Sequence, residues 1–333
     1  MTEQSQTGNS SQAKPRRTKE VVRHVHLERT RPKLSNYDEQ DNARKAKKAQ
    51  NRRSRAQSAS RGKKASASPA RRDSRAKLRI IPLGGLDAIG KNMTAFECGN
   101  DMVLDDAGLM FPDDNHPLIL PDYSYVLENA EKLRGIIITH GHEDHTGALP
   151  YLLKDLDRKV PIYATKLTLG LIEGKLAEHK IKNAKLCEIK PGQSIKLGSI
   201  TAEFFSVNHS IPDAVGVFFQ SPAGNVLHTG DFKLDQSPID GVHTDFGALA
   251  RFSKIGVDLM MSDSTNASNP NFTPSEAEVG KALDTIISQA TGRVIVASFA
   301  SHIHRMQQIC DAAVRNGRKV AVTGRSMVQK TDI

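Results

Sequence analysis

The stretch that decides the fold is Thr139-His140-Gly141-His142-Glu143-Asp144-His145-Thr146-Gly147, which places three histidines and two carboxylates within six residues. It directly follows the apolar run Arg134–Ile138, which is typical of a buried strand. Imidazole and carboxylate groups bind first-row metal ions. Because only a glycine separates the first two histidines, both rings can turn to one side, and the later aspartate and histidine can face a second metal. The alternative interpretation is a polar loop with scattered histidines.

Two later segments each place a ligand-type residue at the end of a predicted strand. The run Ala202–Val207 precedes His209, and the run Asn225–Leu227 precedes His228-Thr229-Gly230-Asp231. The chain therefore has the order His-x-His-x-Asp-His, then a lone histidine, then a lone aspartate. Six ligand-type side chains in this order strongly favour a metal site, whereas an isolated His-Thr-Gly-Asp would be a weak signal.

Composition limits the class of protein. The chain has 333 residues, of which 38% are hydrophobic, enough for about two domains. No apolar run approaches the length of a membrane span, and the N-terminus lacks the apolar region of a secretory signal, so we expect no membrane partner. A cytoplasmic, reducing location is favoured by three widely spaced cysteines outside any Cys-x-x-Cys pair: Cys98, Cys187 and Cys310.

The net charge of +10 is concentrated in the first 77 residues. Residues 1–77 hold 22 Lys and Arg against 7 Asp and Glu, which leaves 25 and 30 for the remainder of the chain. Residues 1–77 also contain few apolar side chains, so we predict a disordered basic tail. Its basic clusters favour a flexible arm that attracts RNA through the phosphates. The alternative is a solubilising tail without a specific partner.

Residues 78–236 are predicted to form a first domain, a sandwich of two sheets flanked by helices with the metals at one sheet edge. Predicted strands cover Leu78–Leu83, Thr94–Cys98, Met102–Leu104 and several segments within 194–220. Predicted helices cover Tyr123–Leu133, His145–Leu156 and Thr165–His179.

The pattern changes after about residue 236, and residues 237–333 are predicted to form an incomplete second domain. Predicted strands at Val257–Ser262, Arg293–Ser298 and Lys319–Thr323 alternate with predicted helices at Pro274–Ala290 and Ser301–Asn316. Strands that alternate with helices are typical of βαβ units on a parallel sheet.

Seven strings together narrow the family: GGLDAIGKNM at 84–93, DAGLMFPDD at 106–114, ITHGHEDHTGALP at 138–150, NHSIPDAVG at 208–216, HTGDFKLD at 228–235, SDSTNAS at 262–268 and SFASHIHRMQQI at 298–309. They resemble the ribonuclease J group of the β-CASP metallo-β-lactamases, over about residues 78–330. The resemblance implies an α/β fold, namely a metallo-β-lactamase αββα sandwich followed by the start of a β-CASP βαβ domain.

The resemblance also implies a site with two Zn²⁺ ions, for which Mn²⁺ is an alternative. Its implied ligands are His140, His142 and His209 for the first ion, Asp144 and His145 for the second, and Asp231 as a bridge. Asp106 matches an aspartate expected to orient the metal loop, and Asp263 matches the acidic residue that opens the β-CASP motif series. The predicted catalytic residues are Asp144, Asp231, Asp106 and Asp263.

The implied activity is 5′-to-3′ exonuclease and endonuclease cleavage in RNA maturation and decay, including rRNA processing. The implied substrate is single-stranded, 5′-monophosphorylated RNA, and the complete protein would be a homodimer or tetramer. Two metals roughly 3.5–4 Å apart can share a water and lower its pKa. A hydroxide bridging two zinc ions would then attack the phosphodiester and leave 5′-phosphate and 3′-hydroxyl ends.

The sequence departs from the family pattern at two places. Ala88 stands where the family usually has an acidic residue, and the chain stops at Ile333, before the later β-CASP histidines, one of which would complete the second metal. We therefore expect weak or absent nuclease activity for this chain. One alternative is a truncated RNA-binding fragment. Another is a different hydrolase on this fold, such as a thioesterase or lactonase, although the insertion after Asp231 argues against it.

Four residues near the second predicted helix of the second domain are candidates for RNA binding: Ser298, Ser301, His304 and Arg305. A strand-to-helix turn can bind phosphate through backbone N–H groups and the helix dipole. The alternative is a plain helix cap. Four other histidines are expected not to be ligands: His116, His179, His228 and His243. With five Tyr and no Trp, no aromatic platform for base stacking is evident.

Overall fold

The computed structural model describes residues 23–24, 76–111 and 118–331. The predicted disordered tail therefore lies outside the described residues except at 23–24 and 76–77, and His116 also lies outside them. Within the described part of the chain, no helix combines the length and the apolar character that a membrane crossing requires.

The first sheet has six strands in the order β2-β3-β4-β5-β6-β7. The strands are β2 (Leu78–Gly84), β3 (Met93–Cys98), β4 (Asp101–Asp105), β5 (Leu133–Ile137), β6 (Pro161–Ala164) and β7 (Lys185–Glu188). β2, β3 and β4 are antiparallel neighbours, whereas β4 to β7 run parallel. The carboxyl ends of β4 and β5, which precede two of the predicted site segments, therefore lie at one edge of this sheet.

The second sheet has five strands in the order β12-β11-β10-β9-β8. They are β8 (Ser194–Leu197), β9 (Ile200–Ser206), β10 (Val215–Ser221), β11 (Gly224–His228) and β12 (Leu259–Met261). All neighbours are antiparallel except β11 and β12, which are parallel.

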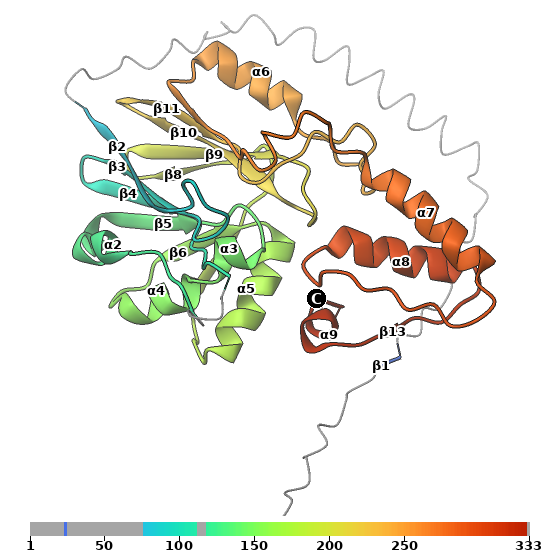
Figure 1. Ribbon diagram of the computed structural model, residues 1–333. Coiled ribbons are helices and arrows are strands. Elements are labelled where there is room, and N and C mark those ends of the chain that lie inside the picture. Colours follow the sequence, from blue (N-terminus) through green and yellow to red (C-terminus); the bar gives the residue numbers. More distant parts are fainter. Residues whose placement is uncertain (1–22, 25–75, 112–117, 332–333) are drawn as a thin grey trace, which may run out of the picture.

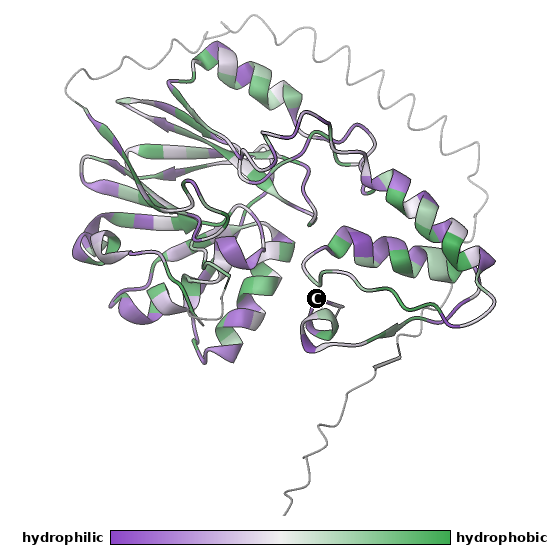
Figure 2. Cartoon of the chain, viewed as in Figure 1, coloured by the Kyte–Doolittle hydropathy of each residue, from purple (hydrophilic) through white to green (hydrophobic). Residues whose placement is uncertain are grey.

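Helices cover both outer faces of the two sheets (Figure 1). The first sheet is covered by α2 (Ser124–Glu128), α4 (Leu149–Asp155) and α5 (Lys166–Glu178), and the second by α6 (Phe246–Ile255). A short 3-10 helix, η1 (Ala130–Lys132), follows α2, and α3 (Glu143–Thr146) lies in the metal loop. Figure 2 shows hydrophilic and hydrophobic residues on each covering helix, as expected for helices that bury one side. The predicted αββα sandwich is confirmed.

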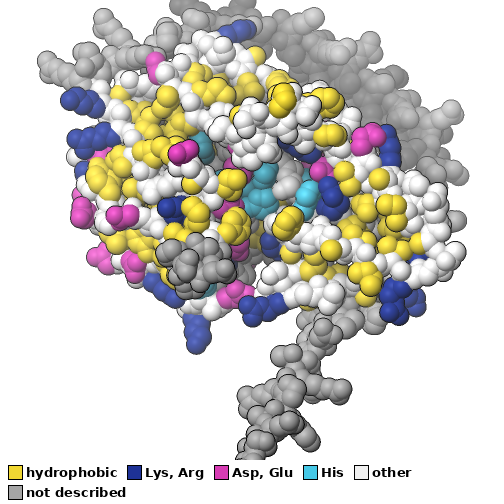
Figure 3. Space-filling view, viewed as in Figure 1, with side chains coloured by type: hydrophobic (Ala, Val, Ile, Leu, Met, Phe, Trp, Pro, Cys, Tyr) yellow, Lys and Arg dark blue, Asp and Glu magenta, His cyan; other side chains and the backbone are white. Residues whose placement is uncertain are grey.

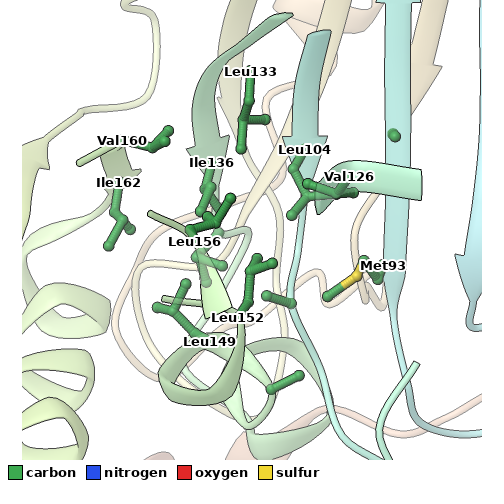
Figure 4. Close-up of a cluster of buried hydrophobic side chains, with 14 of the residues drawn as sticks. Met93, Leu104, Val126, Leu133, Ile136, Leu149, Leu152, Leu156, Val160 and Ile162 are labelled. Carbon is green, nitrogen blue, oxygen red and sulfur yellow. The ribbon is translucent and has the colours of Figure 1, made fainter. Parts of the chain in front are cut away.

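Alternation along the central strands explains the layers. Leu104 in β4 packs under the helices of the first sheet (Figure 4), as does Ala95 in β3. Their neighbours Phe96 and Val103 belong to the cluster between the sheets. There Phe96 stacks on Phe219 of β10 with ring centroids 4.2 Å apart. The two sheets therefore share one apolar layer, and their loops at one edge are held in fixed relative positions.

The last part of the chain contains α7 (Glu276–Gln289), α8 (Ile303–Arg315), β13 (Ala321–Val322) and α9 (Arg325–Thr331). The expected helices over 274–290 and 301–316 are confirmed. The expected parallel sheet is wrong for the described residues, because β12 joins the second sheet, β13 pairs antiparallel with β1 (Arg23–His24), and Arg293–Ser298 forms no strand. No described strand pairs with residues 293–298, and Ile295 in this segment is 88% exposed.

Two predicted helices of the first domain are interrupted. The helix expected over Tyr123–Leu133 ends at Glu128 and resumes as η1, with Asn129 at the junction, and Leu133 already belongs to β5. The helix expected over His145–Leu156 is divided into α3 and α4, and Pro150 occupies the first turn of α4. Proline lacks a backbone N–H and is favoured at a helix start, which explains the second break.

Candidate metal centre

Three histidine rings converge where the loops after β5 and β9 meet. Nδ1 of His142 lies 3.1 Å from Nε2 of His140 and 3.1 Å from Nε2 of His209. These nitrogens all lie within 4.8 Å of one another, close enough to hold one metal ion. At most one nitrogen of each facing pair can carry hydrogen, so each pair presents at least one lone pair, and a tautomer without hydrogen on these three nitrogens can bind one cation between them.

A second group of ligand-type atoms shares His140 with the first. Nε2 of His145 lies 3.3 Å from Oδ1 of Asp231 and 3.6 Å from Oδ2 of Asp144. The other oxygen of Asp231 lies 4.0 Å from Nε2 of His140 and 3.8 Å from Nε2 of His209. Asp231 thus reaches both groups, as a bridging carboxylate must. The six predicted ligands are brought together, and their binding of metal stays a prediction.

The protonation states of His142, His209 and Asp231 suit metal binding. Burial lowers the pKa of His142 to about 3 and that of His209 to about 4, so both rings are neutral at pH 7. In His145 burial also lowers the pKa, but two neighbouring aspartates outweigh it and raise the pKa well above its usual value. For Asp231 the hydrogen bond and charge of His145 outweigh burial and lower the pKa to about 2. His142, His209 and Asp231 are therefore in the forms that bind a divalent cation, whereas His145 has to release its proton in order to bind one.

Asp106 holds the metal loop from behind. Its Oδ1 accepts hydrogen bonds from the backbone N–H and hydroxyl of Thr139, at 2.8 Å and 3.1 Å, and its Oδ2 lies 2.7 Å from Nδ1 of His145. The backbone of Asp106 is left-handed, with φ of 60°, which aspartate tolerates better than most residues. The carboxylate therefore leaves Nε2 of His145 free to face the metal group.

The turn at 84–93 also contacts the metal loop. The side-chain amide of Asn92 donates to the backbone oxygen of Asp144 at 3.1 Å and lies 3.0 Å from Nε2 of His145. Behind it, Nδ1 of His228 lies 2.6 Å from Oδ2 of the buried Asp105. The sequence placed His228 outside the ligands but offered no signal for this pair.

Gly108 allows the loop after β4 to touch the metal loop. A β-carbon at this position would overlap the backbone oxygen of Asp144, which itself accepts from Asn92. We expect Gly108→Ala to lower the free energy of unfolding by about 1–3 kcal/mol, because neither backbone can yield without moving the other. Gly174→Ala is the matched control: α5 leaves open space there, so it should stabilise the fold by up to about 1 kcal/mol. Thermal unfolding of both variants measures this, and equal effects would contradict the packing argument.

The remaining candidates are Asp263 and the four predicted RNA-binding residues, which lie in the chain after β12. Asp263 follows β12 and caps its own turn, accepting from Thr265 N–H at 2.7 Å. Arg305 donates to Oε2 of Glu276 at 2.8 Å, and Nε2 of His304 lies 3.7 Å from Oδ2 of Asp240, so both side chains already face carboxylates. The backbone oxygen of Ser301 contacts His142, whereas Ser298 lines a separate apolar cavity. The RNA contacts of Ser298, Ser301, His304 and Arg305 stay a prediction.

The metal groups open into a hollow. A cavity of about 680 Å³ is lined by Asp144, His145 and Asp231 together with the 84–90 turn and residues 260–266. Figure 3 shows histidine side chains gathered in a depression at the centre of one face. A substrate can therefore reach the ligand-type residues from solvent.

Comparisons with known proteins agree with this geometry. Residues 102–295 match the family model of the beta-lactamase superfamily domain, and residues 291–333 match that of the ribonuclease J beta-CASP domain. A ribonuclease J of Corynebacterium glutamicum is 47% identical over 259 residues, and one of Thermus thermophilus is 46% identical over 261 residues. These matches cover 77% and 76% of this chain but 36% and 46% of the relatives, so the chain spans less than half of their length.

A solved structure shows the same fold at low sequence identity. A protein of unknown function from Enterococcus faecalis superimposes with a TM-score of 0.53 at 18% identity, covering 71% of this chain and 63% of that one. The strand order, the histidine and aspartate groups at the sheet edge, and the family models agree with one another. The chain belongs to the ribonuclease J family of the metallo-β-lactamase superfamily, and it carries the metallo-β-lactamase domain and the start of the β-CASP domain.

Proposed function

We propose that this chain contributes the metal centre of a ribonuclease that hydrolyses phosphodiester bonds of RNA. The observation that carries the proposal is the pair of ligand groups joined through His140 and Asp231 in a chain that matches ribonuclease J. His140, His142 and His209 would hold one zinc ion, and Asp144 with His145 a second. Bound metal ions would act as Lewis acids and lower the pKa of a water.

The chain's own residues would position this chemistry. Asp106 fixes His145 through its Nδ1, and Asn92 fixes the backbone of Asp144. Burial raises the pKa of Asp144, so this carboxylate accepts a proton more readily than an ordinary aspartate. It lines the cavity together with Asp231, where a phosphodiester would enter. Hydrolysis of the phosphodiester at this site would leave a 5′-phosphate and a 3′-hydroxyl.

The substrate and setting extend the proposal. Relatives named ribonuclease J point to RNA, and we propose single-stranded, 5′-monophosphorylated RNA in the cytoplasm as the substrate, with exonuclease and endonuclease action. A homodimer or tetramer would belong to the longer relatives. The processing of rRNA and the relative weight of the two cleavage modes are part of this proposal.

Cleavage of a 5′-monophosphorylated RNA oligonucleotide with zinc or manganese tests the function. We expect slow cleavage that a chelator stops, and Asp231→Ala should reduce the rate by at least about 100-fold, because the bridging carboxylate serves both metal groups. Asp258→Ala, on the loop before β12 and outside both ligand groups, is the control for the effects of producing and purifying a variant, and its cleavage rate should stay near that of the wild type. A metal-loaded chain that binds the RNA but leaves it intact would contradict hydrolysis and favour an RNA-binding role.

A further inference from the structure

His142 has a polar partner outside the metal group. While its Nδ1 faces His140 and His209, its Nε2 lies 3.2 Å from the backbone oxygen of Ser301, 159 residues further along the chain. A ring that binds metal through Nδ1 must carry its hydrogen on Nε2. That hydrogen then donates to the Ser301 carbonyl. The hydroxyl of Ser210 is a more distant alternative at 3.5 Å.

This contact differs from those of the other rings in the metal loop. Nδ1 of His140 lies 3.1 Å from the Thr139 hydroxyl, and Nδ1 of His145 lies 2.7 Å from Asp106, so both outer partners belong to the metallo-β-lactamase domain. Metal-binding histidines almost always donate their second N–H to such a partner, which fixes the tautomer and the ring orientation. For His142 that partner belongs to the turn before α8.

The position of that turn depends on Glu276, the first residue of α7. Its Oε2 accepts from Nη2 of Arg305 at 2.8 Å, and its Oε1 lies 3.4 Å from Nε2 of His302. Its backbone oxygen accepts from the Gln308 side chain at 2.7 Å. His302 in turn caps α8, because its Nδ1 accepts from the backbone N–H of Arg305 at 3.2 Å. The carboxylate of Glu276, whose side chain is 16% exposed, therefore anchors both His302 and Arg305 at the start of α8.

We propose that the Ser301 carbonyl is the outer partner that fixes His142 as a metal ligand, and that Glu276 is the positioning residue that holds this carbonyl in place. The inference rests on the metal centre proposed above. The start of the β-CASP domain thereby forms part of the metal site without supplying a ligand. α7 and α8 lie side by side across from the metal loop (Figure 1).

Such a link works in both directions. If the turn before α8 strengthens metal binding, bound metal must strengthen the contact of that turn with His142 by the same factor. Zinc should therefore slow amide hydrogen exchange in residues 299–306, which lie outside the ligand loops. Exchange there that is the same with and without zinc, while the metal loop itself becomes protected, would overturn the link.

Zinc affinity of the full chain, measured by competition with a chromogenic chelator, tests the role of Glu276. Glu276→Ala should weaken zinc binding about tenfold, near the lower end of the roughly 10–100-fold loss expected for an outer partner, because it acts on His142 through a turn. Glu278→Ala is the matched control: Glu278 lies two residues along α7, is 62% exposed and pairs only with Lys281 among the described residues, so zinc affinity should be unchanged.

The outcomes separate the inference from the function it rests on. A wild-type chain that holds no zinc would contradict the metal centre and the inference together. Zinc bound equally well by wild type and a folded Glu276→Ala variant would overturn only the role of Glu276. Should Glu276→Ala unfold, Glu276→Gln keeps the shape and one acceptor oxygen, and it should lose part of the affinity while its circular dichroism stays that of the wild type.

Discussion

Replacing His142 with alanine is expected to lower the zinc affinity of the chain by at least about 100-fold. Its Nδ1 lies 3.1 Å from Nε2 of both His140 and His209, and no other side chain of the described residues completes this first ligand group. Loss of a hydrogen-bond partner of a metal ligand lowers metal affinity roughly 10–100-fold, and loss of the ligand itself should lower it at least as much. Chelator competition and zinc content after dialysis measure the effect.

The matched control for this prediction is His243→Ala. His243 is exposed and belongs to neither ligand group, so its removal changes the number of histidines without touching the site. Zinc affinity should stay at the wild-type value. A fall of similar size in both variants would show that the metal binds non-specifically to histidines. Zinc affinity that stays at the wild-type value in both variants would contradict the assignment of His142 to the first ligand group.

Replacing Asp106 with alanine is expected to lower the free energy of unfolding by about 3–5 kcal/mol. The change leaves the backbone N–H and hydroxyl of Thr139 and the Nδ1 of His145 without their buried acceptor. Removing one partner of a buried charged pair typically costs this amount. Alanine is also strained at the left-handed backbone of this position, where φ is 60°. Chemical denaturation of the metal-free protein measures the loss.

Two further variants separate the buried contacts from backbone strain. Asp87→Ala makes the same change at an exposed position with φ of 53°, so it reports the strain alone and should cost about 1–2 kcal/mol or less. Asp106→Asn keeps the shape and one acceptor for Thr139 but removes the charge facing His145. It should retain more stability than Asp106→Ala. Equal losses for Asp87→Ala and Asp106→Ala would refute the proposed anchoring role.

Much of the metallo-β-lactamase domain could be predicted from the sequence, because the predicted ligands follow the apolar strands β5, β9 and β11, whose carboxyl ends meet at one edge of the two-sheet sandwich. Alternation also separates the two faces of β3 and β4, as Ala95 and Phe96 show. The expected αββα sandwich and the convergence of five ligand-type residues in two groups, with Asp144 3.6 Å from His145, both follow from such local patterns.

What could not be predicted depends on contacts between distant segments. The partner of His142 is a backbone oxygen, and the Ser301 side chain carries no signal of that role. The RNA contact expected of Arg305 stays a prediction, but its hydrogen bond to Glu276 could not be predicted, because a sequence motif does not show which carboxylate a neighbouring helix brings close. The strand expected at 293–298 is absent for a related reason, since a strand needs a neighbour and local propensity supplies none, whereas the strand expected at 319–323 is present only as the two residues of β13.

X-ray absorption at the zinc edge of the zinc-loaded chain tests the central claim most directly. The account predicts zinc retained after dialysis, with a nitrogen and oxygen shell at about 2.0–2.1 Å and imidazole scattering that weakens in the His142→Ala variant. The chain also has three free cysteines among the described residues, so sulfur is a real competitor. A sulfur shell at about 2.3 Å, or a folded chain that retains no zinc, would contradict the account.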